Sequence, residues 1–365
     1  MAKDSKSETT YMRGARSFIQ GRFETVARES FDDGWAPEEK DERPLQTQVT
    51  IERARSIVSH NDSPDVGFDS SINPYRGCEH GCIYCYARPS HSYLELSPGL
   101  DFETKLFAKT NAAELLLAEL AKPGYKPTPI ALGANTDCYQ PIERKYRITR
   151  QILEVLSECN HPVTMVTKSA LVERDIDVIA PMAARRMARV YLSITTLDRE
   201  LARKMEPRAA APQRRLQALK TLSSAGIPVG VMVAPIIPQL NDRDLEAILA
   251  AAAANGATSA GWVLVRLPRE VAPLFREWLD AHYPLRAAHI MSLIGQMRGG
   301  RDYDSTFGAR MRGTGEFAAL LEQRFTVASR RLGLDRGREQ TGLDTSRFRP
   351  PGPSRGDGRQ GDLFA

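Results

Sequence analysis

Residues 77–88 read GCEHGCIYCYAR and contain three of the five cysteines of the chain, Cys78, Cys82 and Cys85. Their spacing is C-x3-C-x2-C, and the two glycines of the run let a loop wrap closely around a bound group. Three thiolates can hold three irons of a four-iron cluster, so the fourth iron is left without a protein ligand. The segment therefore predicts a 4Fe–4S cluster with one open coordination site.

A structural zinc site is the main alternative for these cysteines. Such a site usually takes four ligands, often in two C-x2-C pairs. The sequence has no second pair, and His80 and His91 lie too close to the cysteines to be a distant second half. Ordinary thiols remain a further reading. A disulfide framework is disfavoured by the odd cysteine count and by the lack of an apolar N-terminal signal, so we expect a reducing, cytoplasmic environment.

The aromatic residue Tyr84 directly precedes the third cysteine, and the pattern C-x3-C-x-aromatic-C resembles the signature of the radical S-adenosylmethionine (radical SAM) superfamily. Further runs resemble a bacterial branch labelled DNA repair photolyase-like, which is related to spore photoproduct lyase. The resemblance covers roughly Val66 to Arg310, and the runs that carry it are INPYRGCEHGCIYCYARP (72–89), NTDCYQPIERKY (135–146), SITTLDRELARKMEP (193–207) and AGIPVGVMVAPIIPQLND (225–242).

This resemblance implies two cofactors, the 4Fe–4S cluster and S-adenosyl-L-methionine (SAM). In the superfamily, SAM binds the open iron and is cleaved reductively to a 5′-deoxyadenosyl radical, which abstracts a hydrogen atom from the substrate. The resemblance also implies an electron donor of the flavodoxin or ferredoxin type as a partner. A lyase-like reaction follows by analogy with spore photoproduct lyase.

Short apolar runs alternate with helix-like stretches in the central part of the chain. This alternation predicts an α/β fold with a parallel sheet. Six such units match the partial (β/α)6 TIM-type barrel typical of radical SAM proteins, whose catalytic groups lie at the C-terminal ends of the strands. The expected strands are residues 67–72, 129–135, 163–169, 189–196, 228–235 and 261–268.

Composition divides the chain into four regions. Residues 1–65 are polar and without sustained periodicity, which predicts a mostly irregular extension. Residues 66–310 form the expected barrel, and residues 311–334 a C-terminal helical segment. Residues 335–365 are rich in Arg, Gly and Pro and cannot bury enough apolar surface to order themselves, so we expect a disordered tail.

The loop after the second expected strand carries Gly133, Asn135 and Thr136. In the superfamily, a glycine-rich strip at this level holds the amino group of SAM. This chain has GANT (133–136) instead, so the resemblance implies that Asn135 and Thr136 supply that contact. The alternative is a simple Asx or ST turn that ends at a proline.

Three polar residues follow the fourth expected strand. Ser193 and Thr195 have the same parity along the chain, so both can face the barrel interior. The resemblance implies that this level contacts the ribose and carboxylate of SAM, and Glu206 could reach the same site or merely close a turn. Cys138 is a candidate hydrogen-atom donor to a product radical, as a thiol is in spore photoproduct lyase, or a small buried residue. Cys159 is expected in the core.

Charge is concentrated near the C-terminus. The net formal charge of the chain is +5, and residues 298–359 alone contain 13 Arg and no Lys against 8 Asp or Glu. Guanidinium groups can grip phosphate oxygens at two points, so this region suits contact with DNA. The alternative is a solvated arginine-rich tail without a partner. No apolar run approaches the ~20 residues that span a bilayer, so we expect no membrane contact.

The final residues QGDLFA resemble short peptides that dock on the bacterial DNA sliding clamp. Gln360, Leu363 and Phe364 match the pattern Q-x-x-L-F, in which the glutamine makes polar contacts and the two apolar residues fill a pocket. A disordered tail presents such a peptide well. A chance match is the alternative.

Three functions therefore remain open. The first is a radical SAM enzyme that acts on nucleic acid, such as a damaged or modified base. The second is a radical SAM enzyme for a small molecule, peptide or protein. The third is a non-catalytic module that binds the clamp or nucleic acid around a structural metal site. Reductive cleavage of SAM separates the first two from the third, and salt-sensitive DNA binding separates the first from the second.

Overall fold

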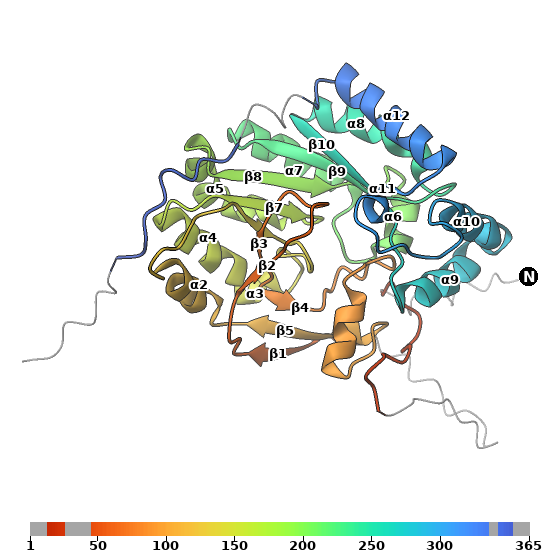
Figure 1. The fold of residues 1–365 in the computed structure, drawn as a ribbon, viewed down its shortest axis with the longest axis horizontal. Helices are drawn as coiled ribbons and strands as arrows, with labels where there is room; N and C mark the ends of the chain where they lie inside the picture. Colours follow the sequence, from red (N-terminus) through yellow and green to blue (C-terminus); the bar gives the residue numbers. More distant parts are fainter. Residues whose placement is uncertain (1–12, 26–44, 336–341, 353–365) are drawn as a thin grey trace, which may run out of the picture.

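The computed structural model describes residues 13–25, 45–335 and 342–352. Its main element is a curved sheet in which six strands run parallel in the order β3, β6, β7, β8, β9, β10 (Figure 1). A short antiparallel strand, β2, pairs with β3 at one edge. The strands are β2 (Val58–His60), β3 (Ser70–Ile72), β6 (Ile130–Leu132), β7 (Val163–Thr167), β8 (Ala188–Ser193), β9 (Val229–Ile236) and β10 (Ser259–Leu264).

This sheet confirms the predicted α/β class with a partial parallel barrel. Several strands end earlier than predicted, because their last residues turn into the loops at the C-terminal edge. Gly133, for example, leaves β6 with a left-handed φ of 80°, and Lys168 follows the last residue of β7.

Helices connect the parallel strands and cover the outside of the sheet (Figure 1). In α4, Ile148, Ile152 and Leu156 recur every fourth residue and are fully or almost fully buried, which places one apolar stripe against the core. The connecting and flanking helices are α2 (Ala112–Leu120), α3 (Glu143–Tyr146), α4 (Ile148–Glu158), η2 (Ala170–Asp175), α5 (Ile176–Ala184), α6 (Arg199–Met205), α7 (Pro212–Ser224), η3 (Asp242–Asp244) and α8 (Leu245–Ala254).

The C-terminal part of the chain returns to the barrel. Helix α12 packs on α8, and the short helix α11 contacts β10 near the C-terminal ends of the strands (Figure 1). No described helix has both the length and the apolar character that a membrane span requires. These helices are α9 (Val271–His282), α10 (Pro284–Gln296), α11 (Ala309–Arg312) and α12 (Glu316–Arg331).

The N-terminal extension is more ordered than predicted. Besides β2, it contributes β1 to a second, small sheet of order β1, β5, β4. The sequence predicted an extension that is mostly irregular or wrapped over the core, and it did not reveal β1, because β1 pairs in parallel with β5 far along the chain, a contact that local sequence cannot show. The elements around this sheet are β1 (Gln48–Glu52), β4 (Tyr75–Arg76), η1 (Arg88–Leu94), α1 (Asp101–Thr104) and β5 (Lys105–Lys109).

The predicted disordered tail is also ordered in part. In residues 342–352, the Arg349 amide donates to the Cys159 carbonyl at 2.8 Å. The ring of Phe348 lies 5.4 Å from that of Tyr125 and 5.5 Å from that of His161, measured between ring centroids. One aromatic anchor thus holds a polar segment that composition alone marks as disordered. The expected clamp peptide, Gln360 to Phe364, lies outside the described residues.

Residues 13–21, which we call the N-terminal strap, cross the loop that carries the three cysteines. The backbone amides of Gly14 and Ala15 donate to the Glu103 carboxylate at 2.9 and 2.8 Å. A Cβ on Gly14 would stand 1.7 Å from the carbonyl oxygen of Gly81, so only glycine fits here. The strap and the cysteine loop therefore touch backbone to backbone.

We predict that Gly14→Ala destabilises the protein by about 1–3 kcal/mol, the usual cost of overpacking a tight contact. Urea unfolding under anaerobic conditions measures this free energy. Gly67→Ala is the matched control, because no atom lies within 4 Å of a Cβ at that position and its backbone is not left-handed. Equal unfolding midpoints for the two variants would show that the strap does not press on the loop.

Candidate active site

The cysteine loop begins directly after β4 and ends at η1. Gly77 and Gly81 both have left-handed φ angles, of 72° and 68°. A Cβ on Gly77 would lie 2.6 Å from a Leu106 methyl group and 2.8 Å from the Phe102 carbonyl oxygen. The two glycines that the sequence places before the first and second cysteines are therefore required by the turn and by close packing.

A buried ion pair between Arg88 and Glu103 supports the cysteine loop. The Arg88 guanidinium is fully buried, pairs with Glu103, and donates to the carbonyl oxygen of Cys82 at 3.0 Å. It also donates to the Pro98 and Gly99 carbonyls at 3.1 and 2.9 Å. A single side chain thus holds the cysteine loop to the segment that precedes α1.

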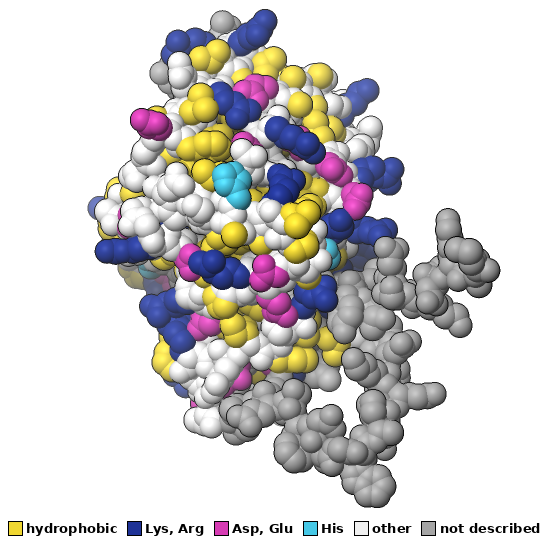
Figure 2. All heavy atoms as spheres, turned by 90° about the vertical axis from the view of Figure 1, so that its right-hand side faces the viewer, with side chains coloured by type: hydrophobic (Ala, Val, Ile, Leu, Met, Phe, Trp, Pro, Cys, Tyr) yellow, Lys and Arg dark blue, Asp and Glu magenta, His cyan; other side chains and the backbone are white. Residues whose placement is uncertain are grey.

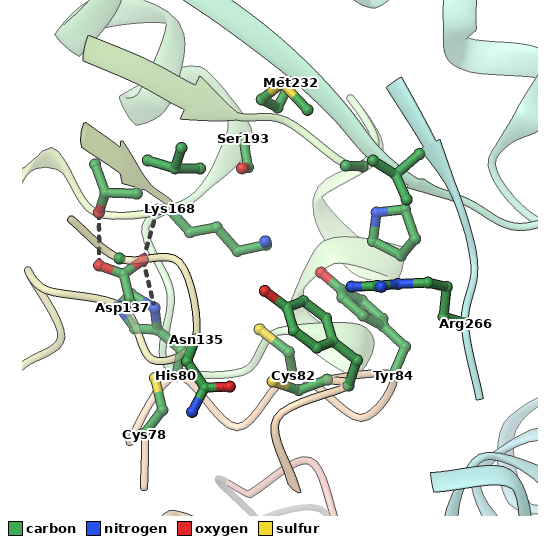
Figure 3. Close-up of a pocket in the computed structure, with 18 of the residues that line it drawn as sticks. Cys78, His80, Cys82, Tyr84, Asn135, Asp137, Lys168, Ser193, Met232 and Arg266 are labelled. Carbon is green, nitrogen blue, oxygen red and sulfur yellow. Dashed lines mark hydrogen bonds and ion pairs between the residues drawn. The ribbon is translucent and has the colours of Figure 1, made fainter. Parts of the chain in front are cut away.

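The three cysteines line one cavity at the C-terminal edge of the parallel sheet (Figure 3). The cavity has a volume of about 240 Å³. Its walls come from the cysteine loop, from the loops after the strands, and from α11. The lining residues are Cys78, His80, Cys82, Tyr84, Cys85, Tyr86, Gly133, Asn135, Asp137, Val166, Thr167, Lys168, Ser193, Met232, Ala234, Pro235, Val263, Leu264, Arg266 and Met311.

The cysteines suit a cluster better than a single ion. No three His, Cys, Asp or Glu side chains among the described residues converge to hold one metal ion, whereas the corners of an iron–sulfur cube keep their thiolates apart. Cys78 and Cys82 are buried, and Cys85 is half-buried. Burial raises the pKa of Cys82 to about 12, so this thiol is protonated at neutral pH without metal, and iron binding has to displace its proton. The residues present therefore fit a 4Fe–4S cluster.

Asp137 organises the wall next to Cys78. Its carboxylate accepts from the Thr167 hydroxyl and from the Lys168 amide, both at 2.7 Å, and it lies 3.3 Å from Nδ1 of His80 (Figure 3). Burial alone would raise the pKa of Asp137, but His80 and these hydrogen bonds outweigh it and lower the pKa to about 2. The cysteine loop is thereby tied to the ends of β6 and β7.

Lys168 carries a cation into the cavity. Its side chain extends from the end of β7 into the open space (Figure 3). The ammonium nitrogen lies 5.8 Å from the centre of the Tyr84 ring. It makes no ion pair with any carboxylate in the described part of the chain. Because no direct ion pair neutralises it, this cation at the cavity wall suits an anionic group of a ligand.

Thr195 and Glu206, both predicted to contact SAM, do not line the cavity. Glu206 is 3% exposed and forms a buried ion pair with Arg215. It also accepts from the Thr195 and Tyr84 hydroxyls. Burial would raise the pKa of Glu206, but Arg215, Lys168 and the hydroxyl donors lower it to about 2. The structure thus places this carboxylate behind Tyr84, where it orients the aromatic ring of the cysteine motif.

Thr136 and Cys138 also lie outside the cavity wall. The Thr136 hydroxyl donates to the Tyr75 carbonyl at 2.8 Å. Cys138 is fully buried, and its sulfur is 3.4 Å from where a Cβ on Gly133 would be, so it lies behind the cavity wall.

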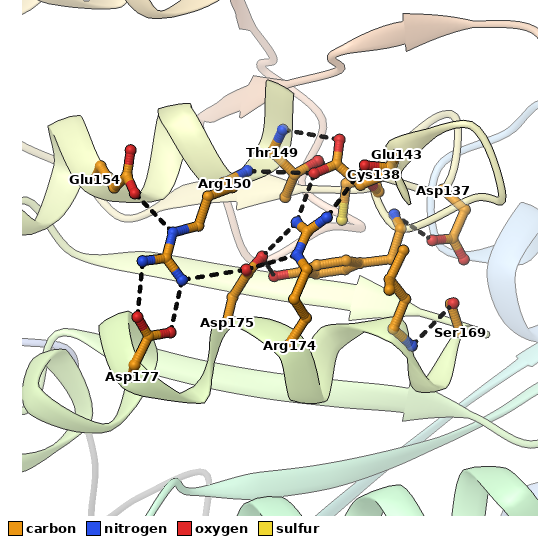
Figure 4. Close-up of polar contacts among 12 residues, drawn as sticks. Asp137, Cys138, Glu143, Thr149, Arg150, Glu154, Ser169, Arg174, Asp175 and Asp177 are labelled. Carbon is orange, nitrogen blue, oxygen red and sulfur yellow. Dashed lines mark hydrogen bonds and ion pairs between the residues drawn. The ribbon is translucent and has the colours of Figure 1, made fainter. Parts of the chain in front are cut away.

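Next to Cys138 lies an ion-pair network of Glu143, Arg174, Asp175 and Arg150 (Figure 4). Arg150 extends this network outward to Asp177 and Glu154, with contacts of 2.6 to 2.7 Å. These ion pairs hold α3, α4 and η2 together behind the cavity wall. Cys138 therefore lies in a packed structural region, which favours its role as a small buried residue. Its role as a hydrogen-atom donor stays a prediction.

Of the remaining predicted residues, Tyr84, Gly133, Asn135 and Ser193 do line the cavity together with the three cysteines. The sequence predicted Asp137 as a polar group at the mouth of the barrel, and it lines the cavity. Sequence reasoning assigned no site role to His80, Tyr86 and Arg266, although His80 and Tyr86 stand inside or beside the cysteine motif, which was a usable signal. Met311 comes from α11, and nothing in its local sequence indicates the site.

Comparison with known proteins identifies the class that this fold and cavity define. Residues 72–252 match the family model of the radical SAM superfamily. These residues are a radical SAM domain. Proteins of this superfamily use a 4Fe–4S cluster and SAM, and the presence of the domain supports an enzymatic role.

Curated relatives cover part of the chain. An uncharacterized protein of Mycobacterium tuberculosis is 38% identical over 219 residues, which are 60% of this chain and 64% of that relative. An uncharacterized protein of Methanocaldococcus jannaschii is 29% identical over 198 residues, which are 54% of this chain and 72% of the relative. The chain thus matches less than two thirds of the length of the mycobacterial relative.

Solved structures of spore photoproduct lyase share the fold. The lyase complexed with dinucleoside spore photoproduct has a TM-score of 0.55 at 16% identity, over 78% of this chain and 79% of the lyase. A double mutant with bound AdoMet and dinucleoside spore photoproduct has a TM-score of 0.55 at 17% identity, over 78% of each chain. At such identity the likeness concerns the fold.

Proposed function

We propose that the protein is a radical SAM enzyme that cleaves SAM reductively and acts on nucleic acid, at a damaged or modified base. One observation carries the first half of this proposal: the three cysteines of the motif and the cationic side chain of Lys168 line the same cavity at the C-terminal edge of a partial barrel. The fold shared with spore photoproduct lyase supports the second half.

Each part of the cavity has a separate task in this proposal. Cys78, Cys82 and Cys85 hold the cluster, and Lys168 binds the carboxylate of SAM. When bound, the cluster and SAM together supply a 5′-deoxyadenosyl radical. Gly133 stands at the cavity wall and lets the end of β6 approach β7 closely, because a Cβ there would lie 2.3 Å from the Val166 carbonyl oxygen.

The other walls orient the ligand and exclude water. Asn135 and Ser193 offer an amide and a hydroxyl at the cavity surface. Met232, Leu264 and Met311 close the opposite side with apolar groups. A cavity with few polar groups on an apolar wall keeps a reactive radical away from solvent.

We predict that anaerobic reconstitution yields about four irons per chain, and that Ala at Cys78, Cys82 or Cys85 abolishes both the iron content and the cleavage of SAM. Iron analysis and chromatography of 5′-deoxyadenosine measure the two. The matched control is Cys138→Ala, which removes a thiol outside the cavity and should retain its iron. Full activity in any variant of the three motif cysteines would remove the assignment.

For Lys168→Met we expect the apparent KM for SAM to rise roughly 10- to 100-fold, because the variant removes a charge-assisted hydrogen bond. The iron content should stay unchanged, since the lysine contributes only its backbone amide to the Asp137 network. Initial rates of 5′-deoxyadenosine formation against SAM concentration give the KM. An unchanged KM would assign the carboxylate of SAM to another side chain.

A separate experiment tests whether nucleic acid is the substrate. The reconstituted protein is incubated with dithionite, SAM and UV-irradiated or base-modified DNA, and both 5′-deoxyadenosine and altered nucleotides are measured. Formation of an altered nucleotide supports the proposal. Cleavage of SAM with every nucleotide intact would favour a small-molecule or protein substrate, and absence of cleavage would favour a non-catalytic module.

Two partners belong to the proposal. A flavodoxin or ferredoxin would supply the electron in the cell, and the C-terminal peptide with Gln360, Leu363 and Phe364 would dock on the DNA sliding clamp. The flavodoxin or ferredoxin would reduce the cluster, and the clamp would hold the enzyme on DNA.

We predict that the peptide QGDLFA binds the clamp with a Kd on the order of micromolar, because a short segment loses conformational entropy when it orders on two apolar anchors. Leu363→Ala with Phe364→Ala should remove this binding in the full-length protein. SAM cleavage serves as the control and should persist, since it requires only the barrel. If the intact protein does not bind at high micromolar concentration, the clamp proposal fails.

A further inference from the structure

A second hollow, which we call the outer groove, adjoins the cavity. It has a volume of about 270 Å³, and its lining includes Arg22, Tyr86, Tyr93, Arg266, Arg269 and Tyr303. Tyr86, Asn135 and Arg266 line both the groove and the cavity. The groove and the cavity of the cysteines therefore adjoin each other at these three side chains.

Arginine is the only charged residue type in the groove lining. Arg22 is neutralised by Glu270, 2.9 Å away. Arg266 and Arg269 form no ion pair with a carboxylate among the residues that the structure describes, and Arg269 is exposed. Neither guanidinium group is neutralised by a carboxylate there, so both can bind phosphate oxygens, which their planar donor geometry fits at two points.

Exposed aromatic rings accompany these cations. Tyr86 is 43% exposed and Tyr93 is 68% exposed. The ring of Tyr93 is held in place by Phe23, with 5.2 Å between centroids, and by the Arg22 guanidinium, 5.5 Å from the centre of the ring. Arg266 lies 4.1 Å from the centre of the Tyr86 ring. Such supported rings beside cations are the surfaces on which nucleobases stack.

The size and charge of the groove limit the kind of nucleic acid that fits. On the visible face of the molecule in Figure 2, Lys and Arg side chains are interspersed with Asp and Glu side chains. A duplex that lies along a protein requires a long track of positive charge. A narrow groove with these two arginines and several rings suits instead one or two nucleotides of an unpaired strand.

We propose that the outer groove binds the unpaired nucleotides that flank the reacting base, with Arg266 and Arg269 on phosphate oxygens and Tyr93 under a base. This inference rests on the proposed function and assigns the substrate contact that function requires. The cavity then receives the reacting base, and the groove selects a polyanionic, single-stranded segment.

The test measures binding of a fluorescein-labelled single-stranded oligonucleotide to the full-length, reconstituted protein by fluorescence anisotropy at several salt concentrations. Arg266→Gln combined with Arg269→Gln should weaken binding at least 10-fold and reduce the salt slope by about 0.7 for each phosphate group that the variant no longer neutralises. Tyr93→Ala should weaken binding roughly 5- to 100-fold with an unchanged salt slope, because stacking is not ionic.

The matched control is Arg243→Gln. Arg243 has a 76% exposed side chain and lines neither the groove nor the cavity, so this variant should bind like the wild type. Iron content and circular dichroism of every variant confirm that it is folded. Equal affinity and salt slope in the double arginine variant, or equal weakening by Arg243→Gln, would overturn the assignment.

SAM cleavage by the wild-type preparation keeps the two proposals apart. If SAM is cleaved but no oligonucleotide binds, the groove assignment is wrong while the radical SAM activity stands. A labelled poly-glutamate peptide is the competing ligand. If it binds as tightly as the oligonucleotide and Tyr93→Ala weakens its binding equally, the groove binds acidic protein segments and our inference is overturned. Binding of the oligonucleotide without SAM cleavage would sink the proposed enzymatic activity instead.

Discussion

The buried ion pair between Arg88 and Glu103 is the contact on which the architecture of the site depends. Arg88 holds the carbonyl of Cys82 and the segment before α1, while Glu103 also receives the amides of Gly14 and Ala15. Loss of one partner would leave an uncompensated buried charge, which costs about 3–5 kcal/mol. The loop, the strap and the small sheet are therefore coupled, and a cluster ligand cannot shift without disturbing all three.

The carboxylate of Asp137 also anchors the cysteine loop, on the side of the loop that faces the barrel. Asp137 joins the cysteine loop, through His80, to the ends of β6 and β7. It also accepts from the amide of Lys168, whose side chain continues into the cavity. Lys168 and the cysteine loop thus share one anchor, which fixes their relative positions. Such support by buried, fully bonded carboxylates is what a reaction with a short-lived radical requires.

The parallel sheet and the cysteine site could be predicted from sequence because their signals are local. Apolar runs alternating with helical stretches specify a parallel sheet, and the three cysteines with two glycines lie within nine residues, 77–85. The prediction of direct contacts was less successful. Thr195 and Thr136 make hydrogen bonds inside the protein instead of lining the cavity. Neither the parity of Thr195 along the chain nor the loop position of Thr136 shows which partner its hydroxyl group finds.

The sequence by itself determined the class of fold, and its three closely spaced cysteines predicted the cluster ligands and carried the resemblance to the radical SAM superfamily, since each of these signals depends on residue types at short spacing. The tertiary structure alone decided which polar residues face the cavity, and it assembled the outer groove from segments near residues 22, 86, 266 and 303. It also ordered β1, the strap and residues 342–352, whose partners lie far away in the chain. The physical reason is the same throughout: a buried contact between distant segments gains its free energy from both, and neither segment alone reveals it.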